Sequence, residues 1–413
     1  MNSTLTSDFI TYTRELFGEE VWQKYLHSFD EPTPVSVRLN PFKPLSSLAS
    51  YHLPFGDPVP HCKDGYYLTE RPNFTLDPLL HAGAYYVQEA SSMYLDKIIR
   101  EELSTLNFQL STVLDLCAAP GGKSTLLRAA LPEDVKLFSN EPDRKRANIL
   151  MENMQKQGHP NVVVTNNYPS DYKKSGLLFD LILTDVPCSG EGMFRKDPAT
   201  IKEWSVQNVM KCQQLQRSII SDIWDCLRPG GILIYSTCTF NRHEDEENIE
   251  WIKDNFEAEQ ILPAKRFIPG VDRGEGLFMA VLRKMSTDVT IKRQNMQALR
   301  IMHDGTKGQE GQEVQKVQKV QRVQKVQGRK DSSLSHSEAL SIATPQDKYP
   351  RVELSREDAL KYLHRESLVL PEETPRGYVI VTYQNLPLGF VKNIGTRANN
   401  LYPQEWKIRN LNP

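Results

Sequence analysis

Short apolar runs alternate with helix-like segments between residues 111 and 284, and this alternation is the feature that most limits how the chain can fold. Apolar runs that predict buried strands occur at residues 113–117, 135–139, 162–164, 181–183 and 232–235. Helices are predicted between them at 123–130, 144–157 and 201–227, with a closing strand at 276–282. Strands that alternate with helices predict βαβ units, a mainly parallel sheet and the α/β fold class.

The N-terminal segment has a different character. Residues 1–100 predict helices and loops, because helix-like apolar spacing at 4–17 and 19–29 is followed by a series of proline-rich turns. We assign residues 1–94 to an N-terminal region and residues 95–284 to the α/β domain.

A repetitive tract follows the α/β domain. Residues 314–327 are a tandem of Val-Gln-Lys/Arg triplets, and a period of three matches neither a helix nor a strand. We therefore predict a low-complexity linker over residues 285–349. Such a basic tract is either a solvated spacer or a weak, salt-sensitive RNA-contacting arm, and the sequence leaves both open.

The C-terminal module is predicted over residues 350–413. Strand-like alternation returns at 377–383 and 388–392, and basic residues then interleave with Tyr402 and Trp406. Basic and aromatic residues on a small β-rich module suit RNA contact, although an ordinary domain surface could carry the same residues.

Composition excludes several classes of protein. The nearest two of the six cysteines, Cys226 and Cys238, are 12 positions apart, which excludes a CxxC zinc pair, and 413 residues are too many for a disulfide-stabilised miniprotein. A net charge of −2 means that any RNA binding must come from local basic patches. We find no apolar stretch near the roughly 20 residues that span a bilayer and no secretory signal, so we expect a cytoplasmic protein with reduced thiols.

A loop of small residues, DLCAAPGGKS, follows the first predicted strand from Asp115 onward. In an open α/β sheet, ligands bind at the carboxyl ends of strands, where small residues let the backbone approach. The end of this loop matches a Walker A motif, but that motif needs a glycine where Cys117 stands, which disfavours nucleoside triphosphate hydrolysis. A nucleoside cofactor such as S-adenosylmethionine needs no phosphate cradle and fits better.

Glu141 stands at the end of the second predicted strand. A carboxylate at this position can accept hydrogen bonds from both hydroxyls of a nucleoside ribose. The alternative is a surface acid that caps the next helix. We predict the ribose role from the position of Glu141 at the strand end.

Two cysteines follow neighbouring strands: Cys188 in DVPCSGEG after the fourth, and Cys238 in YSTCTF after the fifth. A deprotonated cysteine is a strong nucleophile. Attack of a thiolate on C6 of cytosine makes C5 an enamine-like carbanion equivalent that can accept a methyl group. The residues alone allow either cysteine to attack.

The segments DLCAAPGGKST, DVPCSGEGMFRKDP and YSTCTF resemble motifs of the RNA (cytosine-5) methyltransferase family, especially its bacterial ribosomal RNA enzymes of the RsmF type. Residues 67–72 and 84–92 are similar to the family's pre-catalytic region, and 387–392 and 397–403 to its PUA-like RNA-binding module. The resemblance implies a class I (Rossmann-like) methyltransferase domain with a mainly parallel seven-stranded sheet. It also implies an N-terminal helical or α+β extension and a C-terminal PUA-like domain.

The resemblance implies roles for individual residues. Cys238 matches the nucleophile that bonds to C6, and Cys188 matches a second cysteine that assists product release. Asp185 matches the acid beside the target base, and Lys123 lies near the reactive centre, where it would favour the thiolate. Residues that match the S-adenosylmethionine site are Cys117, Ala118, Ala119, Pro120, Gly121, Gly122, Lys123, Glu141, Asn167 and Asp185. No metal is implied.

Two positions depart from the family pattern. Val186 stands where the family usually has alanine, a small change that we expect to be tolerated. The third strand ends in Thr165-Asn166-Asn167-Tyr168, where the family often has an acid toward the adenine, so an amide such as that of Asn167 would have to serve.

The resemblance favours 16S ribosomal RNA of the small subunit as the substrate. Transfer RNA stays open, and so does a non-catalytic RNA-binding factor in ribosome assembly. DNA cytosine methyltransferases usually carry their nucleophile after strand four. Here cysteines follow both strands four and five, which favours RNA.

Overall fold

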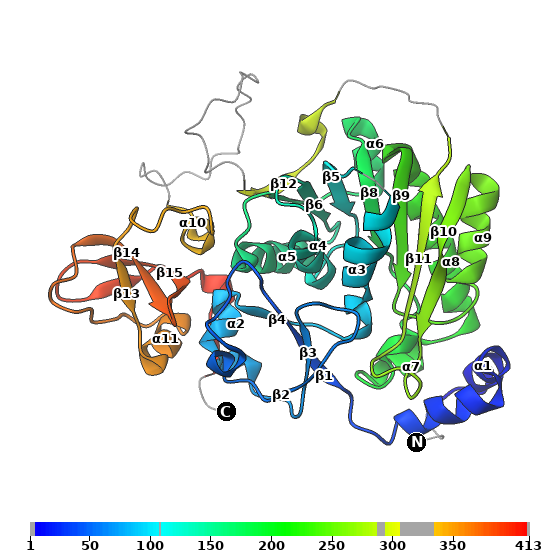
Figure 1. Ribbon diagram of the computed structural model, residues 1–413, viewed down its shortest axis with the longest axis horizontal. Coiled ribbons are helices and arrows are strands. Elements are labelled where there is room, and N and C mark those ends of the chain that lie inside the picture. The colour runs from blue at the N-terminus through cyan, green and yellow to red at the C-terminus, as the bar shows by residue number, and fades with distance from the viewer. Residues whose placement is uncertain (1–4, 107–108, 287–293, 306–333, 411–413) are drawn as a thin grey trace. The chain divides into compact units, whose positions relative to one another are not determined.

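The computed structural model describes residues 5–106, 109–286, 294–305 and 334–410 (Figure 1). The chain forms two compact units. The larger unit comprises Met1–Pro72, Ala84–Met154 and Asn161–His303, and the smaller unit comprises Asn73–Gly83, Gln155–Pro160 and Asp304–Pro413. Every residue predicted to act in catalysis or cofactor binding belongs to the larger unit. None of the described helices has the length and apolar character needed to cross a membrane.

An eight-stranded sheet forms the centre of the larger unit, with the strand order β10-β11-β9-β8-β5-β6-β7-β12. Neighbouring strands from β9 to β7 run parallel, whereas β11 pairs antiparallel with both β9 and β10. The bounds are β5(Thr112–Asp115), β6(Lys136–Asn140), β7(Val162–Thr165), β8(Phe179–Asp185), β9(Leu227–Thr237), β10(Ala258–Phe267), β11(Leu277–Lys284) and β12(Ile301–Asp304). The predicted α/β class with a mainly parallel sheet is confirmed.

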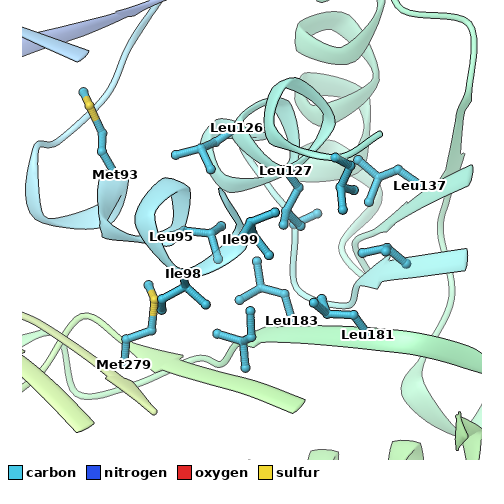
Figure 2. Close-up of a cluster of buried hydrophobic side chains, with 14 of the residues drawn as sticks. Met93, Leu95, Ile98, Ile99, Leu126, Leu127, Leu137, Leu181, Leu183 and Met279 are labelled. Atoms are coloured by element: carbon cyan, nitrogen blue, oxygen red, sulfur yellow. The ribbon is translucent and has the colours of Figure 1, made fainter. Parts of the chain in front are cut away.

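Apolar side chains cover both faces of this sheet. Because successive residues of a strand point to opposite faces, Val113 belongs to one buried cluster and Leu114 to the other. The first cluster includes side chains of α3(Tyr94–Lys97), α4(Gly122–Ala130) and α5(Arg144–Gln157), and the second includes side chains of α6(Pro169–Ser175), α8(Val206–Ile223) and α9(Glu246–Asn255). Figure 2 shows part of the first cluster, where Leu127 of α4 lies over Leu181 and Leu183 of β8.

A kinked helix and a small sheet precede the central sheet in sequence. Helix α1(Ser7–Ser28) bends at Gly18 and joins the two helices predicted at 4–17 and 19–29. Four antiparallel strands pair in the order β2-β3-β1-β4, with the bounds β1(Val35–Leu39), β2(Phe55–Pro58), β3(Gly65–Leu68) and β4(Tyr85–Val87). Apolar spacing, which predicted helices and loops for residues 1–100, missed these strands, whereas the α+β form of the extension that the resemblance implied agrees with them. These strands are three to five residues long, too short for their alternation to stand out.

The single helix predicted at 201–227 is also wrong, because the chain forms α7(Ala199–Glu203) and α8(Val206–Ile223). Between them Trp204 has an extended backbone, and the side chain of Ser205 caps α8 by accepting a hydrogen bond from its first turn. Serine is a favoured N-cap, a signal that apolar periodicity alone overlooks. Leu227, the last residue of the predicted helix, is instead the first residue of β9.

The central sheet has eight strands where the resemblance implies seven. The additional strand, β12, lies beside β7 at one edge. It falls in the range predicted as a linker, and so does helix α10(His336–Leu340). Two described segments of that range are thus ordered elements, whereas the triplet repeat lies outside the described residues. The four-part division of the chain stays a prediction.

The smaller unit contains a four-stranded sheet with the order β13-β14-β15-β16. β13 pairs with β14 in parallel, and the other pairs are antiparallel. Tyr362, Val381 and Val391 are fully buried in its core. Its elements are α2(Pro78–Ala82), α10, β13(Arg351–Glu353), α11(Arg356–Leu363), β14(Gly377–Tyr383), β15(Leu386–Asn393) and β16(Ala398–Asn400). The two strands predicted in this region are confirmed as β14 and β15.

Leu127→Ala tests the core under α4. The Leu127 side chain has no exposed surface, so its truncation should leave a cavity and lower the free energy of unfolding by about 2–5 kcal/mol. Urea denaturation followed by circular dichroism measures the loss. Leu215→Ala is the matched control, because Leu215 is 49% exposed and should change stability by no more than about 0.5 kcal/mol. Equal losses in the two variants would contradict the packing described here.

Candidate active site

The candidate site lies where the parallel strands of the central sheet end. Asp115 is the last residue of β5 and Asp185 is the last residue of β8. Glu141 directly follows β6, and Cys238 directly follows β9. Parallel neighbours place their carboxyl ends at one edge of the sheet, which is where open α/β sheets bind ligands.

The two cysteine sulfurs are in contact. Cys188 Sγ lies 3.0 Å from Cys238 Sγ, well beyond the roughly 2.05 Å of a disulfide bond, and both residues are free thiols. The hydrogen bond with Cys238, together with burial, raises the pKa of Cys188 well above its usual value. Cys188 therefore stays protonated while it faces the Cys238 sulfur.

An ion pair stands beside the sulfurs. Lys123 Nζ lies 2.8 Å from Asp185 Oδ2, and Ser236 Oγ donates to Asp185 Oδ1 at 3.0 Å. Burial opposes the charge of Lys123, but the Asp185 carboxylate and the negative potential of Cys238 outweigh it, and the pKa of Lys123 is raised. The ammonium group is thus held charged, in electrostatic reach of Cys238.

Asp115 is a buried carboxylate with spare hydrogen-bonding capacity. Its Oδ2 accepts a hydrogen bond of 2.6 Å from Ser124 Oγ, whereas its Oδ1 accepts none from the residues that the structure describes. Burial raises the pKa of Asp115 to about 7. Buried polar groups are normally satisfied, so an unsatisfied acceptor at a ligand-binding edge indicates a place for a donor from a ligand.

The loop between β5 and α4 holds its small residues tightly. The carbonyl oxygens of Ala119 and Pro120 accept hydrogen bonds from Arg146 Nη2 at 2.9 Å and Asn153 Nδ2 at 2.8 Å. Gly121 adopts a φ of 118°, which favours glycine, and a Cβ there would lie 3.3 Å from Asn153 Cβ.

The backbone of the same loop is anchored at one end by β6 and leads directly into α4. Ala118 N donates to Asn140 O at 2.8 Å, and α4 begins at Gly122. Burial raises the pKa of Cys117 well above its usual value, so this thiol stays neutral. The loop therefore offers a neutral cradle of small residues with the N-terminal backbone of a helix behind it.

Glu141 is almost fully buried, and its carboxylate is partly engaged. Oε1 accepts a hydrogen bond of 2.9 Å from Asp143 N, and Arg146 Nη1 lies 3.5 Å from Oε2. A carboxylate has capacity for further donors beyond these contacts. The ribose role of Glu141 stays a prediction that this geometry permits.

Asn167 lies at the same edge, but its amide is already used. Its Oδ1 accepts from Arg300 N at 2.9 Å and its Nδ2 donates to Arg300 O at 3.3 Å, so the side chain is held on the segment that leads into β12. Asn166 Nδ2 donates to the carbonyl oxygens of Glu141 and Pro142. An adenine contact by the Asn167 amide stays a prediction, and it would require breaking this pair of bonds.

Asn140 supports the site and was given no role by the sequence. It has no exposed surface, and its Nδ2 donates at 3.0 Å to the carbonyl oxygens of both Leu116 and Asn167. Its Oδ1 accepts hydrogen bonds from Thr165 Oγ1 at 3.0 Å and Asn167 N at 3.1 Å. One side chain thus ties together the ends of β5, β6 and β7. Its position at the end of a predicted strand was the one sequence feature that could have indicated this role.

Arg38 of β1 also supports the site. It is 3% exposed, and its Nη2 donates to Thr125 Oγ1 at 2.7 Å, while its Nε donates to Gln88 Oε1 at 2.9 Å. The guanidinium therefore joins the small N-terminal sheet to the first turn of α4, which carries Lys123. No sequence motif pointed to this contact, because it joins residues 87 positions apart.

No group of three or more histidine, cysteine, aspartate or glutamate side chains suited to a metal ion occurs within the described ranges. The donors at the sheet edge are instead thiols, carboxylates and an ammonium group. This set can attack, bind and move protons at an organic ligand.

Three family models match successive parts of the chain. The model described as 16S rRNA methyltransferase RsmB/F matches residues 105–283. The N-terminal domain of 16S rRNA methyltransferase RsmF matches residues 5–90, and the methyltransferase RsmF PUA domain matches residues 349–408. The chain belongs to the RsmF-type methyltransferase family. The predicted resemblance is confirmed, and so are the N-terminal and PUA domains that it implied.

Curated relatives of this RsmF-type chain match it along nearly all of its length. The ribosomal RNA small subunit methyltransferase F of Citrobacter koseri is 29% identical and covers 96% of this chain and 95% of its own. The protein of the same name from Escherichia coli O9:H4 is 28% identical with the same coverage.

Solved structures agree with the fold. A methyltransferase homolog from Pyrococcus horikoshii is 27% identical, with a TM-score of 0.55 over 68% of this chain and 100% of that chain. An NSun6 structure from the same organism has a TM-score of 0.57 over 68% and 98% of the two chains, and at 18% identity it supports the fold alone. Family and fold together imply S-adenosylmethionine as the methyl donor.

Asp115→Asn tests the buried carboxyl group through the pH dependence of stability. The folded protein keeps the Asp115 proton up to about pH 7, whereas the unfolded chain releases it near the usual aspartate pKa of 3.8. The wild type should therefore lose stability as pH rises through this window, by at most about 1.4 kcal/mol per pH unit, and the variant should not.

The measurement is the difference in melting temperature between variant and wild type at pH 5 and pH 8, without added cofactor. The variant should gain on the wild type as pH rises. Asp254→Asn on the exposed side of α9 is the control and should show no such trend. A constant difference for Asp115→Asn would contradict the raised pKa.

Proposed function

We propose that this chain transfers a methyl group from S-adenosylmethionine to C5 of a cytosine in small-subunit ribosomal RNA, with Cys238 as the nucleophile. The observation that carries the proposal is the 3.0 Å contact between the Cys188 and Cys238 sulfurs at the edge where the parallel strands end. Two thiols in contact, beside a charged lysine–aspartate pair, provide a nucleophile and a proton acceptor for the same base.

The residues at the sheet edge fit a nucleoside cofactor with a cationic amino-acid part. The unsatisfied Oδ1 of Asp115 offers an acceptor for an ammonium group, the loop from Cys117 to Gly122 offers small residues, and Glu141 offers a carboxylate for ribose hydroxyls. When bound, S-adenosylmethionine supplies an electrophilic methyl group. The remaining chemistry belongs to the side chains of the chain itself.

Cys238 begins the reaction by forming a bond to C6 of cytosine. The nearby Lys123 ammonium favours the thiolate, because an adjacent positive charge stabilises the ionised sulfur. Asp185 can hold the polar edge of the base while electron density moves from C6 to C5. C5 then uses this electron pair to form the new carbon–carbon bond to the methyl group.

Release requires loss of the C5 proton and cleavage of the bond between Cys238 and C6. The hydrogen bond with Cys238 is the main reason that the pKa of Cys188 is raised. Once Cys238 is bonded to carbon, that effect is lost, and Cys188 becomes easier to deprotonate. Cys188 first gives its own proton to solvent, and its thiolate then accepts the C5 proton. The electron pair of the C5–H bond re-forms the C5–C6 double bond, and Cys238 leaves as a thiolate, so that one proton is released overall.

The substrate class rests on the relatives and on the family models. The two curated relatives are named as small-subunit ribosomal RNA methyltransferases, and the C-terminal match is to an RsmF PUA domain. We extend that substrate to this chain and propose the cytoplasm as its compartment. Transfer RNA as a substrate is supported by none of these relatives.

The product assay decides the proposed function. The purified protein, incubated with S-adenosylmethionine and unmodified small-subunit ribosomal RNA, should yield 5-methylcytidine in nucleosides measured by mass spectrometry. Cys238→Ala should bind the cofactor as tightly as the wild type, yet lower the yield by at least about 1,000-fold because the attack on C6 is lost. Methylation at another atom, or full activity in Cys238→Ala, would refute the assignment.

Cys188→Ala tests the release step. Without the second sulfur, C5 should keep its proton after methyl transfer, and Cys238 should stay bonded to the RNA. We expect a protein–RNA complex that survives denaturing gel electrophoresis. Cys226→Ala is the matched control, because this cysteine directly precedes the first residue of β9, at the end of the strand opposite to Cys238, and should leave no complex. A Cys188→Ala variant that turns over freely would argue against the role of Cys188 in release.

A further inference from the structure

The two cysteines lie on separate loops, and each loop carries one buried glutamate. Glu191 belongs to the Cys188 loop, residues 186–193, and is 1% exposed. Glu244 belongs to the Cys238 loop, residues 238–245, and has no exposed surface. A buried carboxylate is costly unless donors surround it, so the partners of these two groups indicate what they do.

Glu191 reaches from the Cys188 loop to the Cys238 loop. Its Oε2 accepts hydrogen bonds from Thr239 Oγ1 at 2.6 Å and from Phe240 N at 3.0 Å, the two residues that follow Cys238. Its Oε1 accepts from Trp204 Nε1 at 2.8 Å. The backbone directly after the nucleophile is thus held by a side chain from the opposite loop.

Glu244 reaches from the Cys238 loop to the Cys188 loop. Its Oε2 accepts from Ser189 N at 3.0 Å, the residue directly after Cys188, and from Gln216 Nε2 at 2.7 Å. The amide of Asn241 lies between the two glutamates. Its Nδ2 donates to Glu244 Oε1 at 2.8 Å and to Glu191 Oε1 at 3.2 Å.

The two loops also touch directly through their backbones. Gly192 N donates to Cys238 O at 3.0 Å. A Cβ at Gly192 would lie 2.9 Å from that same oxygen and 2.4 Å from Gly276 O, so only glycine allows this approach. The backbones of the two loops are therefore in close contact, and the two carboxylates align one loop with the other.

The contacts of both side chains suit a carboxylate better than an amide. Each glutamate faces three or more N–H or O–H donors, and a carboxylate accepts at both oxygens. A glutamine would place its own N–H groups against some of those donors and leave them unsatisfied. Charge-assisted hydrogen bonds are also shorter and stronger than neutral ones, which suits a rigid alignment.

We propose that Glu191 and Glu244 form a reciprocal latch that holds the sulfurs of Cys238 and Cys188 in contact. Glu191 is the positioning residue for the Cys238 loop, and Glu244 is the positioning residue for the Cys188 loop. The chemical role of this latch rests on the proposed function, because that function makes the two sulfurs the reacting groups. The alignment itself can be tested without RNA.

The first experiment measures how readily the two thiols meet. The oxidant diamide takes two electrons and two protons from a pair of thiols, forming a disulfide and its own hydrazine. Cross-linking between Cys188 and Cys238, followed by peptide mass spectrometry, should be fast in the wild type. Glu191→Gln and Glu244→Gln should slow it about tenfold or more, because a misalignment of about 1 Å strongly lowers the rate of reaction between two groups.

Controls separate alignment from folding and from charge. Glu250→Gln removes one negative charge from the exposed side of α9 and should cross-link like the wild type. Thr239→Val removes only one donor to Glu191 and should slow cross-linking less than Glu191→Gln does. S-adenosylmethionine binding, measured by calorimetry, should be retained in every variant. Cross-linking at the wild-type rate in both glutamine variants, or none in the wild type, would overturn the proposal.

The second experiment separates the two halves of the latch with RNA present. Glu244→Gln should accumulate a denaturant-resistant protein–RNA adduct, as a weaker form of the Cys188→Ala effect, because the release cysteine is misplaced. Glu191→Gln should instead slow formation of the adduct. Identical behaviour of the two variants would overturn the assignment of one glutamate to each loop. Failure of all variants and the wild type to methylate RNA, with the cross-linking differences intact, would reject the proposed function and keep the latch.

Discussion

Burial of both faces of the central sheet is the constraint on which the active site depends. Two apolar clusters cover the strands from either side, so charged groups can gather only where the strands end. The parallel run from β9 to β7 brings several such ends to one edge. Asp115, Asp185 and Cys238 are adjacent there because their strands are neighbours, although they are far apart in the sequence.

Polar groups at this edge are buried or partly buried, and several are stabilised by a partner from another element. Lys123 of α4 pairs with Asp185 of β8, and Asn140 bonds to the backbone beyond two other strands. Such contacts are strong in a low-dielectric setting and costly to leave incomplete. Asp115 Oδ1 accepts no hydrogen bond from the described residues, and this spare acceptor makes the edge suited to a cationic ligand group. The site is therefore rigid where it must align groups and incomplete where a ligand must enter.

The contact between the two sulfurs links the structure to the proposed chemistry. Cys238 raises the pKa of Cys188 only because the two loops are held together. Glu191 and Glu244 supply that alignment from within the same two loops, which explains why ionisable groups are buried so close to the nucleophile. Helix α1 adds a second support. Its Phe9 packs against Phe194, which directly follows the Cys188 loop, and against Phe240 of the Cys238 loop.

The sequence by itself determined the α/β alternation, the place of the cofactor loop and the pair of cysteines, because strand length, apolar spacing and local motifs are properties of neighbouring residues. It did not determine the four short N-terminal strands, the break before α8 or the β12 edge, whose patterns are too brief to stand above their surroundings. The engagement of Asn167 with Arg300, the reach of Arg38 to Thr125 and the crossed contacts of Glu191 and Glu244 were decided only by tertiary structure. These contacts join distant segments, and a buried hydrogen bond between such segments leaves no periodic trace in the chain.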